Sequence, residues 1–79
     1  MTYHTRTPYQ LAMALKDKRK TLELTQKEAG RKIGLLPKTI SALETHPERC
    51  TLESLFKLIS ALDLEIELHE KSQEQKGEW

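Results

Sequence analysis

The chain has 79 residues, a formal net charge of +1 and one cysteine, so we expect one small domain without a disulfide. His4, His46 and His69 are far apart and match no zinc-site spacing, so neither a metal nor another cofactor is expected. No apolar run approaches the roughly 18 residues of a membrane span, and the polar start of the chain is unlike a signal sequence, which together indicate a cytoplasmic protein.

Charge is unevenly distributed along the chain. Residues 1–45 contain nine Lys and Arg against four acids, a net +5, whereas residues 46–79 contain four against eight, a net −4. A basic front half suits a polyanionic partner such as nucleic acid. Ordinary solubilising surface charge is the alternative explanation.

A first helix is predicted to begin at Thr7. Thr7 occupies the N-cap, Pro8 the first turn and Gln10 the capping-box position, and Leu11 and Leu15 form the buried stripe. The basic cluster at 16–20 lies near the end of this helix, where cations complement the helix dipole. That cluster therefore has a structural role as well as a possible functional one.

A second helix is predicted to begin after Thr25, with Glu28 three residues later as its capping-box partner. It should run to about Ile33 and stop at Gly34, because glycine adopts the left-handed turn conformation readily. Gly30 is the small residue that two tightly crossing helices require. The spacing predicts two short helices joined by a tight turn.

The third helix should open at Pro37, place Ile40 and Leu43 on one face, and end near Glu44. A polar connection at 46–49 leads to Thr51, which caps a longer helix. Apolar residues recur in this fourth helix every three or four positions: Leu52, Leu55, Phe56, Ile59 and Leu62. Leu58 and Ala61 widen the apolar surface, which fits either a dimer contact or full burial within the monomer.

Residues 64–69 change period, because Leu64, Ile66 and Leu68 alternate with polar residues, as in a half-buried strand. A single strand leaves its backbone groups unpaired, so we expect it to pair with the same strand of a second copy about a two-fold axis. Leu64, Ile66 and Leu68 are thus the predicted dimerisation residues. The alternative is that 64–69 continues the preceding helix.

Residues 71–79 are polar and aperiodic and are predicted to form a flexible C-terminal tail that ends in Trp79. Tryptophan is common as a buried anchor in a partner's pocket, so Trp79 is a candidate partner contact. A chance terminus is the alternative.

The most specific pattern lies between residues 25 and 44. Read together, Thr25-Gln26, Ala29-Gly30, Ile33-Gly34, Thr39-Ile40-Ser41 and Leu43-Glu44 resemble the helix-turn-helix of the Cro and phage-repressor superfamily. The expected fold is therefore all-α: a lambda-repressor-like bundle of four to five helices, with one C-terminal strand that pairs across a homodimer.

In such a unit the third helix enters the major groove of DNA and its N-terminal residues face the base edges. We expect base contacts there, from the helix and from the residue before it, while the second helix begins at the phosphate backbone. The base-facing candidates are Leu36, Pro37, Lys38, Ser41 and Ala42. The phosphate-contacting candidates are Thr25, Gln26, Lys27 and Thr39.

The resemblance extends over nearly the whole chain and is to the HipB antitoxins of HipBA toxin–antitoxin systems. It includes residues 9–12, the Pro47 connection, the lone strand and the final Glu78-Trp79. The resemblance implies a homodimer joined by an intersubunit β-lid, an inverted-repeat operator, autorepression and neutralisation of a HipA-type serine/threonine kinase toxin. It places Trp79 on the toxin. Leu36 and Pro37 depart from the polar base readers common in the family, so the operator sequence is not predicted, and neither are the toxin's identity and the stoichiometry.

Residues 1–70 are expected to form the DNA-binding and dimerisation domain. Two alternatives have the same fold: a stand-alone phage-type repressor and a protein-interaction module. An enzyme is not expected, because no Ser/His/Asp or Cys/His arrangement offers catalytic residues.

Overall fold

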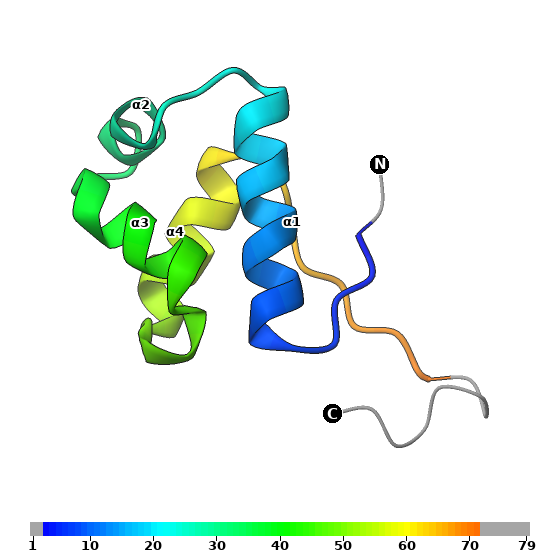
Figure 1. Ribbon diagram of the computed structural model, residues 1–79. Coiled ribbons are helices and arrows are strands. Elements are labelled where there is room, and N and C mark those ends of the chain that lie inside the picture. Colours follow the sequence, from blue (N-terminus) through cyan, green and yellow to red (C-terminus); the bar gives the residue numbers. More distant parts are fainter. Residues whose placement is uncertain (1–2, 72–79) are drawn as a thin grey trace.

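The computed structural model describes residues 3–71, which form a helical bundle (Figure 1). In chain order the helices are α1 (Pro8–Thr21), α2 (Gln26–Arg31), α3 (Pro37–Thr45), the short 3-10 turn η1 (Pro47–Arg49) and α4 (Leu52–Ala61). The predicted all-helical bundle of four to five helices is confirmed. No helix in the described range is long and apolar enough to cross a membrane.

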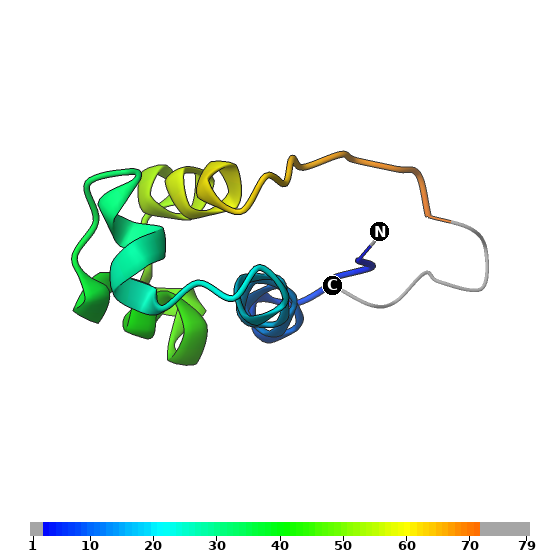
Figure 2. The same cartoon turned by 90° about the horizontal axis from the view of Figure 1, so that it is seen from above.

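The two end segments leave the bundle on the same side, away from α2 and α3 (Figure 2). The segment before α1 and the segment after α4 run outwards from α1 and α4, respectively. The side formed by α2 and α3 therefore lies opposite these two end segments.

Helix α1 begins as predicted at Thr7, whose hydroxyl oxygen accepts a hydrogen bond from the Gln10 backbone N–H at 3.1 Å. The return bond differs from the prediction. The Gln10 side-chain oxygen accepts from the backbone N–H of Arg6, at 2.6 Å, and so reaches one residue before the cap. This longer reach fixes the arm that enters the helix.

Helix α4 stops because Asp63 adopts a left-handed conformation, with φ of 58°. The Asp63 N–H donates to the Ser60 carbonyl at 3.1 Å and the Leu64 N–H donates to the Ile59 carbonyl at 3.0 Å. These two bonds form a Schellman motif, which satisfies the last carbonyls and turns the chain out of the helix. The alternative that 64–69 continues the helix is therefore wrong.

Residues 64–71 are extended but are not a strand, because no other segment within residues 3–71 pairs with them. Leu64 is half-buried against the core, Ile66 is more exposed, and Leu68 is 94% exposed. The predicted strand is thus absent from the single chain, for the same physical reason that led us to expect a second copy. The intersubunit pairing stays a prediction.

The core joins all four helices around Ile40 and Leu43 of α3, which are 0% and 1% exposed. Its remaining buried members are Leu15, Ala29, Leu58, Ile59 and Leu62. The wide apolar surface of α4 is only partly buried, since Leu52 and Phe56 are 71% and 51% exposed. Full burial of that surface within the monomer is therefore wrong.

Candidate nucleic-acid interface

The capping box at the start of α2 forms as predicted. The Glu28 N–H donates to the Thr25 hydroxyl oxygen at 3.0 Å, and the Thr25 N–H donates to the Glu28 carboxylate at 2.8 Å. The bond from the Thr25 backbone is the main reason that the pKa of Glu28 lies below its ordinary value. Helix α2 ends at Arg31, two residues before the predicted Ile33.

Two glycines shape the turn between α2 and α3. A side chain on Gly30 would clash with the carbonyl oxygen of Leu35 and lie 3.1 Å from its carbonyl carbon, so only glycine permits this approach. The Gly30 carbonyl in turn accepts hydrogen bonds from the N–H groups of Ile33 and Leu35, at 3.1 and 2.9 Å. Gly34 has φ of +72° and open space around it, so its requirement is conformational.

Helix α3 buries one face and presents the opposite one. Ile40 and Leu43 point into the core, while Lys38, Ser41 and Thr45 recur on the opposite face at spacings of three and four. Thr45 was not among the predicted residues. Its hydroxyl donates to the Ser41 carbonyl at 2.8 Å, and its position in the repeat from Lys38 is the signal that could have identified it.

None of the predicted DNA-contacting residues is buried. Those of the turn and of α3 lie together on the side of the bundle opposite the segments before α1 and after α4 (Figures 1 and 2). Three are half-buried: Gln26, Thr39 and Ser41. The exposed ones are Thr25, Lys27, Leu36, Pro37, Lys38 and Ala42. Trp79, the predicted toxin contact, lies outside the described residues.

An internal ion pair couples this unit to α1. Arg19 Nε donates to Glu44 Oε2 at 2.7 Å, and Arg19 also donates to the Leu24 carbonyl at 2.8 Å. The side-chain amide nitrogen Nε2 of Gln26 donates to Glu44 Oε1 at 3.1 Å. Arg19, predicted only as part of the basic cluster at 16–20, is therefore buried and neutralised, while Gln26 has a structural bond beside its predicted phosphate contact.

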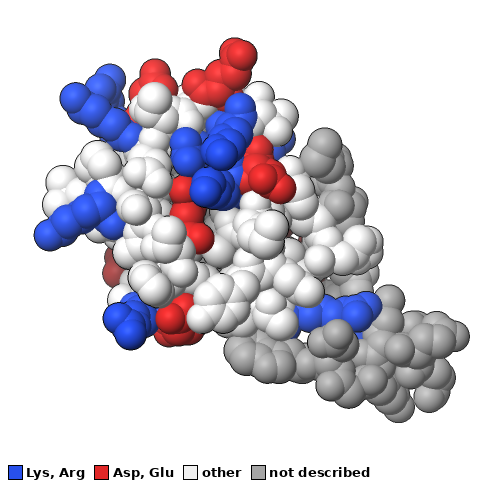
Figure 3. Space-filling view, in the orientation of Figure 1, with Lys and Arg blue, Asp and Glu red and all other residues white. Residues whose placement is uncertain are grey.

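Lysine and arginine side chains lie along the side formed by α2 and α3 and over the upper part of α1, with acidic groups between them (Figure 3). The accessible basic residues of these helices and their turn are Lys16, Lys18, Lys20, Lys27, Arg31, Lys32 and Lys38. This distribution keeps positive charge beside the exposed face of α3, as contact with a polyanion requires.

A shallow groove of about 380 Å³ lies beside α3, between that helix and the start of α4. Lys38, Ala42, Arg49 and Ser54 are among its lining residues. Arg49, which the sequence prediction did not include, thus lies next to the exposed face of α3. Within residues 3–71 no group of three or more His, Cys, Asp or Glu gathers as a metal site would require.

Comparison with known proteins also finds a helix-turn-helix unit in this chain. The family described as Helix-turn-helix matches residues 15–69. Antitoxin HipB of Escherichia coli K12 is 36% identical, with 92% of this chain and 91% of that protein covered, and Antitoxin HipB of Escherichia coli O6:H1 is 35% identical, with 92% and 85% covered.

Two solved structures are similar to this chain in both fold and sequence. A complex of a HipB variant with an O2 20mer has a TM-score of 0.87 at 35% identity, covering 91% of this chain and all of that one. A HipA-HipB-O2-O3 complex has a TM-score of 0.86 at 35% identity, covering 90% of this chain and all of that one.

Proposed function

The chain belongs to the helix-turn-helix family and, within it, to the HipB antitoxins, and on this premise we propose that it represses its own operon and neutralises a HipA-type serine/threonine kinase toxin. It acts by binding in the cytoplasm and not by catalysis. The observation that carries the proposal is the exposed face of α3, held by Gly30 and Gly34 in a fold that solved HipB structures share in complexes with O2 and with HipA.

The N-terminal half of α3 reads the operator in the major groove. Lys38 donates to guanine O6 and N7, Ser41 serves either base type, and Ala42 meets a thymine methyl. Leu36, 62% exposed, and Pro37 add apolar contacts at the wall of the groove, and exposure of a large apolar side chain there supports that role. The phosphate contacts are Thr25, Gln26, Lys27 and Thr39, with Arg49 added from the structure.

A homodimer provides the second reading helix. Leu64, Ile66 and Leu68 pair with the same residues of a second copy, which supplies the missing partner for the extended segment after α4. Two α3 helices then occupy successive major grooves about 34–36 Å apart, so the operator is an inverted repeat. Residues 1–70 form the DNA-binding and dimerisation domain, and Trp79 in the tail 71–79 contacts the toxin.

A gel shift on the DNA upstream of the chain's own gene tests operator reading. Lys38→Ala is expected to weaken binding by about 1–3 kcal/mol, roughly 5–150-fold, with the loss confined to one base position in each half-site. The matched control is Lys57→Ala, because Lys57 lies on α4 and pairs with Glu53 at 3.6 Å. Equal affinity and preference in the Lys38 variant and the control would show that α3 does not read DNA as proposed.

Retention of a kinase tests the antitoxin role. The intact chain is expected to retain a HipA-type kinase in a pull-down, and deletion of Trp79 is expected to weaken that retention while operator binding stays unchanged. A chain that binds its operator but retains no kinase would instead be a stand-alone repressor.

A further inference from the structure

The shallow groove of about 380 Å³ beside α3 continues the proposed DNA-contacting surface past the end of that helix. Lys38, Thr39 and Ala42, all proposed DNA contacts, line its α3 side. Its lining also includes His46, the residue after α3, and Arg49, the last residue of η1. The function proposed above gives the His46 side chain no role.

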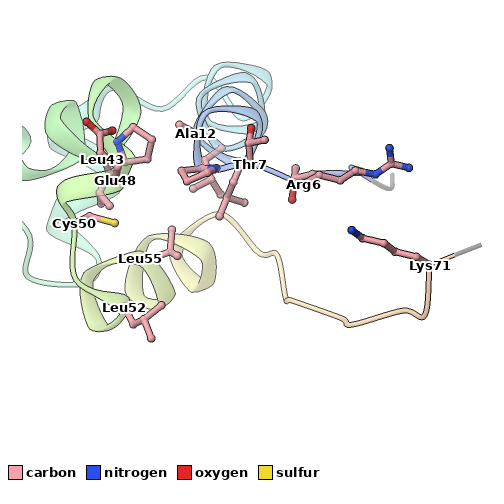
Figure 4. Close-up of a pocket in the computed structure, with 14 residues that line it drawn as sticks. Arg6, Thr7, Ala12, Leu43, Glu48, Cys50, Leu52, Leu55 and Lys71 are labelled. Carbon is pink, nitrogen blue, oxygen red and sulfur yellow. The ribbon is translucent and has the colours of Figure 1, made fainter. Parts of the chain in front are cut away.

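A larger groove, of about 490 Å³, lies between α1, η1 and the start of α4 (Figure 4). Leu43 and Cys50 line both grooves, so the two adjoin at these side chains. The larger groove borders the extended segment after α4, which the proposed homodimer pairs with a second copy. It therefore belongs to the side of the proposed dimer contact, whereas the smaller groove belongs to α3.

The backbone holds His46 in place at the end of α3. Its N–H donates to the Ala42 carbonyl at 2.7 Å, and its carbonyl accepts from the Arg49 N–H at 3.0 Å. The imidazole is 60% exposed and the Arg49 side chain is 80% exposed. Two nitrogen-bearing side chains thus extend from one hydrogen-bonded turn and are open to an outside partner.

Charged side chains from α3 and η1 make the groove positive. Lys38 of α3 and Arg49 of η1 are the cations among its described lining residues. The Glu48 carboxylate is close by, with Oε2 3.7 Å from His46 Nδ1 and 4.0 Å from Arg49 Nε. Its contact with His46 is an ion pair only when the imidazole is protonated. Two cations against one acid leave a positive charge, which protonation of His46 increases.

The remaining polar groups of the groove add no charge near neutral pH. Burial raises the pKa of the Cys50 thiol, which is therefore uncharged there. Thr51 and Ser54, at the start of α4, contribute neutral hydroxyl groups. Histidine is the side chain that ordinarily changes charge between pH 5 and 8. In that range the charge of the groove therefore depends on His46.

We propose that this groove binds a phosphate of the operator backbone, with Arg49 and protonated His46 as donors, so that operator affinity rises as the pH falls. The proposal rests on the proposed function, because it adds contacts to the same DNA. A protonated imidazole donates from both ring nitrogens, so Nε2 can donate to a phosphate while Nδ1 stays beside Glu48. A neutral ring has a single N–H and cannot donate on both sides.

The length of α3 places the groove at the DNA backbone and not over the bases. At 1.5 Å per residue, His46 lies roughly 12 Å along the helix from Lys38, and the major groove is about 12 Å wide. When the N-terminal half of α3 faces the base edges, the end of the helix meets a bordering strand. That strand carries a phosphate for about every 3.4 Å of helix axis, so one lies near the two donors.

DNA is favoured over an acidic peptide, which would meet the same cations. Lys38 and Thr39 are proposed DNA contacts and line this groove as well. A duplex that contacts them covers the groove and excludes a peptide from it.

Fluorescence anisotropy of the full chain, on a labelled duplex of the DNA upstream of its own gene, tests the pH dependence at fixed ionic strength. We expect the wild type to bind at least about threefold tighter at about pH 6 than at about pH 7.5, because proton binding and phosphate binding favour each other. His46→Gln should lose most of this dependence, since glutamine donates a hydrogen bond but does not change charge. The matched control is His69→Gln, because His69 pairs with Glu67 at 3.1 Å and does not line the groove.

Salt dependence shows whether the contact is to phosphate. At about pH 6, Arg49→Gln should reduce the slope of log affinity against log salt by about 1 for each half-site. Its loss of affinity should also be equal on all duplex sequences, because phosphates carry no sequence information. Lys57→Gln is the control and should keep the wild-type slope, since Lys57 pairs with Glu53 at 3.6 Å on α4.

Circular dichroism verifies that the variants are folded. An equal pH response in the wild type and His46→Gln, a response lost in His69→Gln instead, or an unchanged salt slope in Arg49→Gln would overturn the proposal. A loss confined to one base position would make Arg49 a base reader and would overturn it as well. Operator binding without a pH response refutes this inference alone, whereas no binding at either pH would refute the proposed function with it.

Discussion

Arg19 of α1 and Glu44 of α3 form a nearly buried ion pair, with Nε and Oε2 at 2.7 Å and side chains only 10% and 3% exposed. A second bond, from Nη2 to Oε1, is 3.1 Å long. The bidentate geometry fixes the angle between the two helices as well as their distance. The orientation of the proposed reading helix therefore depends on a buried residue of α1 that is outside the proposed DNA-contacting set.

Glu44→Ala is expected to lower the free energy of unfolding by about 3–5 kcal/mol, because it leaves the buried Arg19 guanidinium without a counter-ion. The double variant Arg19→Met with Glu44→Leu should recover most of this loss, since apolar side chains avoid desolvation of the charges. Urea unfolding at one fixed chain concentration measures both. A single variant less than about 1 kcal/mol below the wild type would show that the pair is incidental.

Gly30→Ala and Gly34→Ala test the two glycine roles separately. The methyl group at Gly30 meets the backbone of Leu35, which cannot move without shifting α3, so we expect destabilisation of about 1–3 kcal/mol or more and weaker operator binding. At Gly34 only the left-handed conformation opposes alanine, at about 1–2 kcal/mol, and operator affinity should be kept. Thermal melting and gel shifts on both proteins decide this, and the reverse order would contradict the assignment.

The caps and the core of this fold could be predicted because they depend on neighbouring residues. Local chemistry and spacing alone predict the helix cap at Thr25, the left-handed turn at Gly34 and the buried face that contains Ile40. The Arg19–Glu44 pair could not be predicted in that way, because its partners are 25 residues apart and four other charged residues share positions 16–20. One signal was present: Arg19 continues the buried stripe at four residues after Leu15.

Two further features depend on information that the sequence does not display. The left-handed conformation that ends α1 and α4 is adopted by Glu23 and Asp63, so no glycine marks these ends. The segment after Asp63 has the alternation of a strand, yet strand pairing needs a second chain. The segment is extended in the single chain, and its pairing with a second copy stays a prediction.

The capping box makes stability depend on pH through Glu28. Its pKa in the folded protein lies below the ordinary value of 4.5, so near that pH the unfolded chain binds more protons and stability rises with pH. The contribution is fully present above the ordinary value and is lost as the pH falls through the lowered one. Glu28→Gln keeps an acceptor for the Thr25 N–H but removes the charge. The wild type should therefore lose more urea resistance than this variant between about pH 6 and about pH 3, and parallel curves would contradict the assignment.

Leu68 offers the most direct test of the proposed dimer, because it is 94% exposed in the single chain and its replacement costs the monomer almost nothing. Burial of a leucine contributes about 1.5–3 kcal/mol, and the two-fold axis doubles the effect, so Leu68→Lys should raise the dimer dissociation constant at least about tenfold. Glu67→Ala is the control, since its side chain points to the opposite face of the proposed strand. Sedimentation equilibrium gives both constants. Equal dissociation constants for the two variants would place the dimer contact elsewhere. A weaker dimer for Glu67→Ala alone would show that the opposite face of the strand lies in the dimer contact.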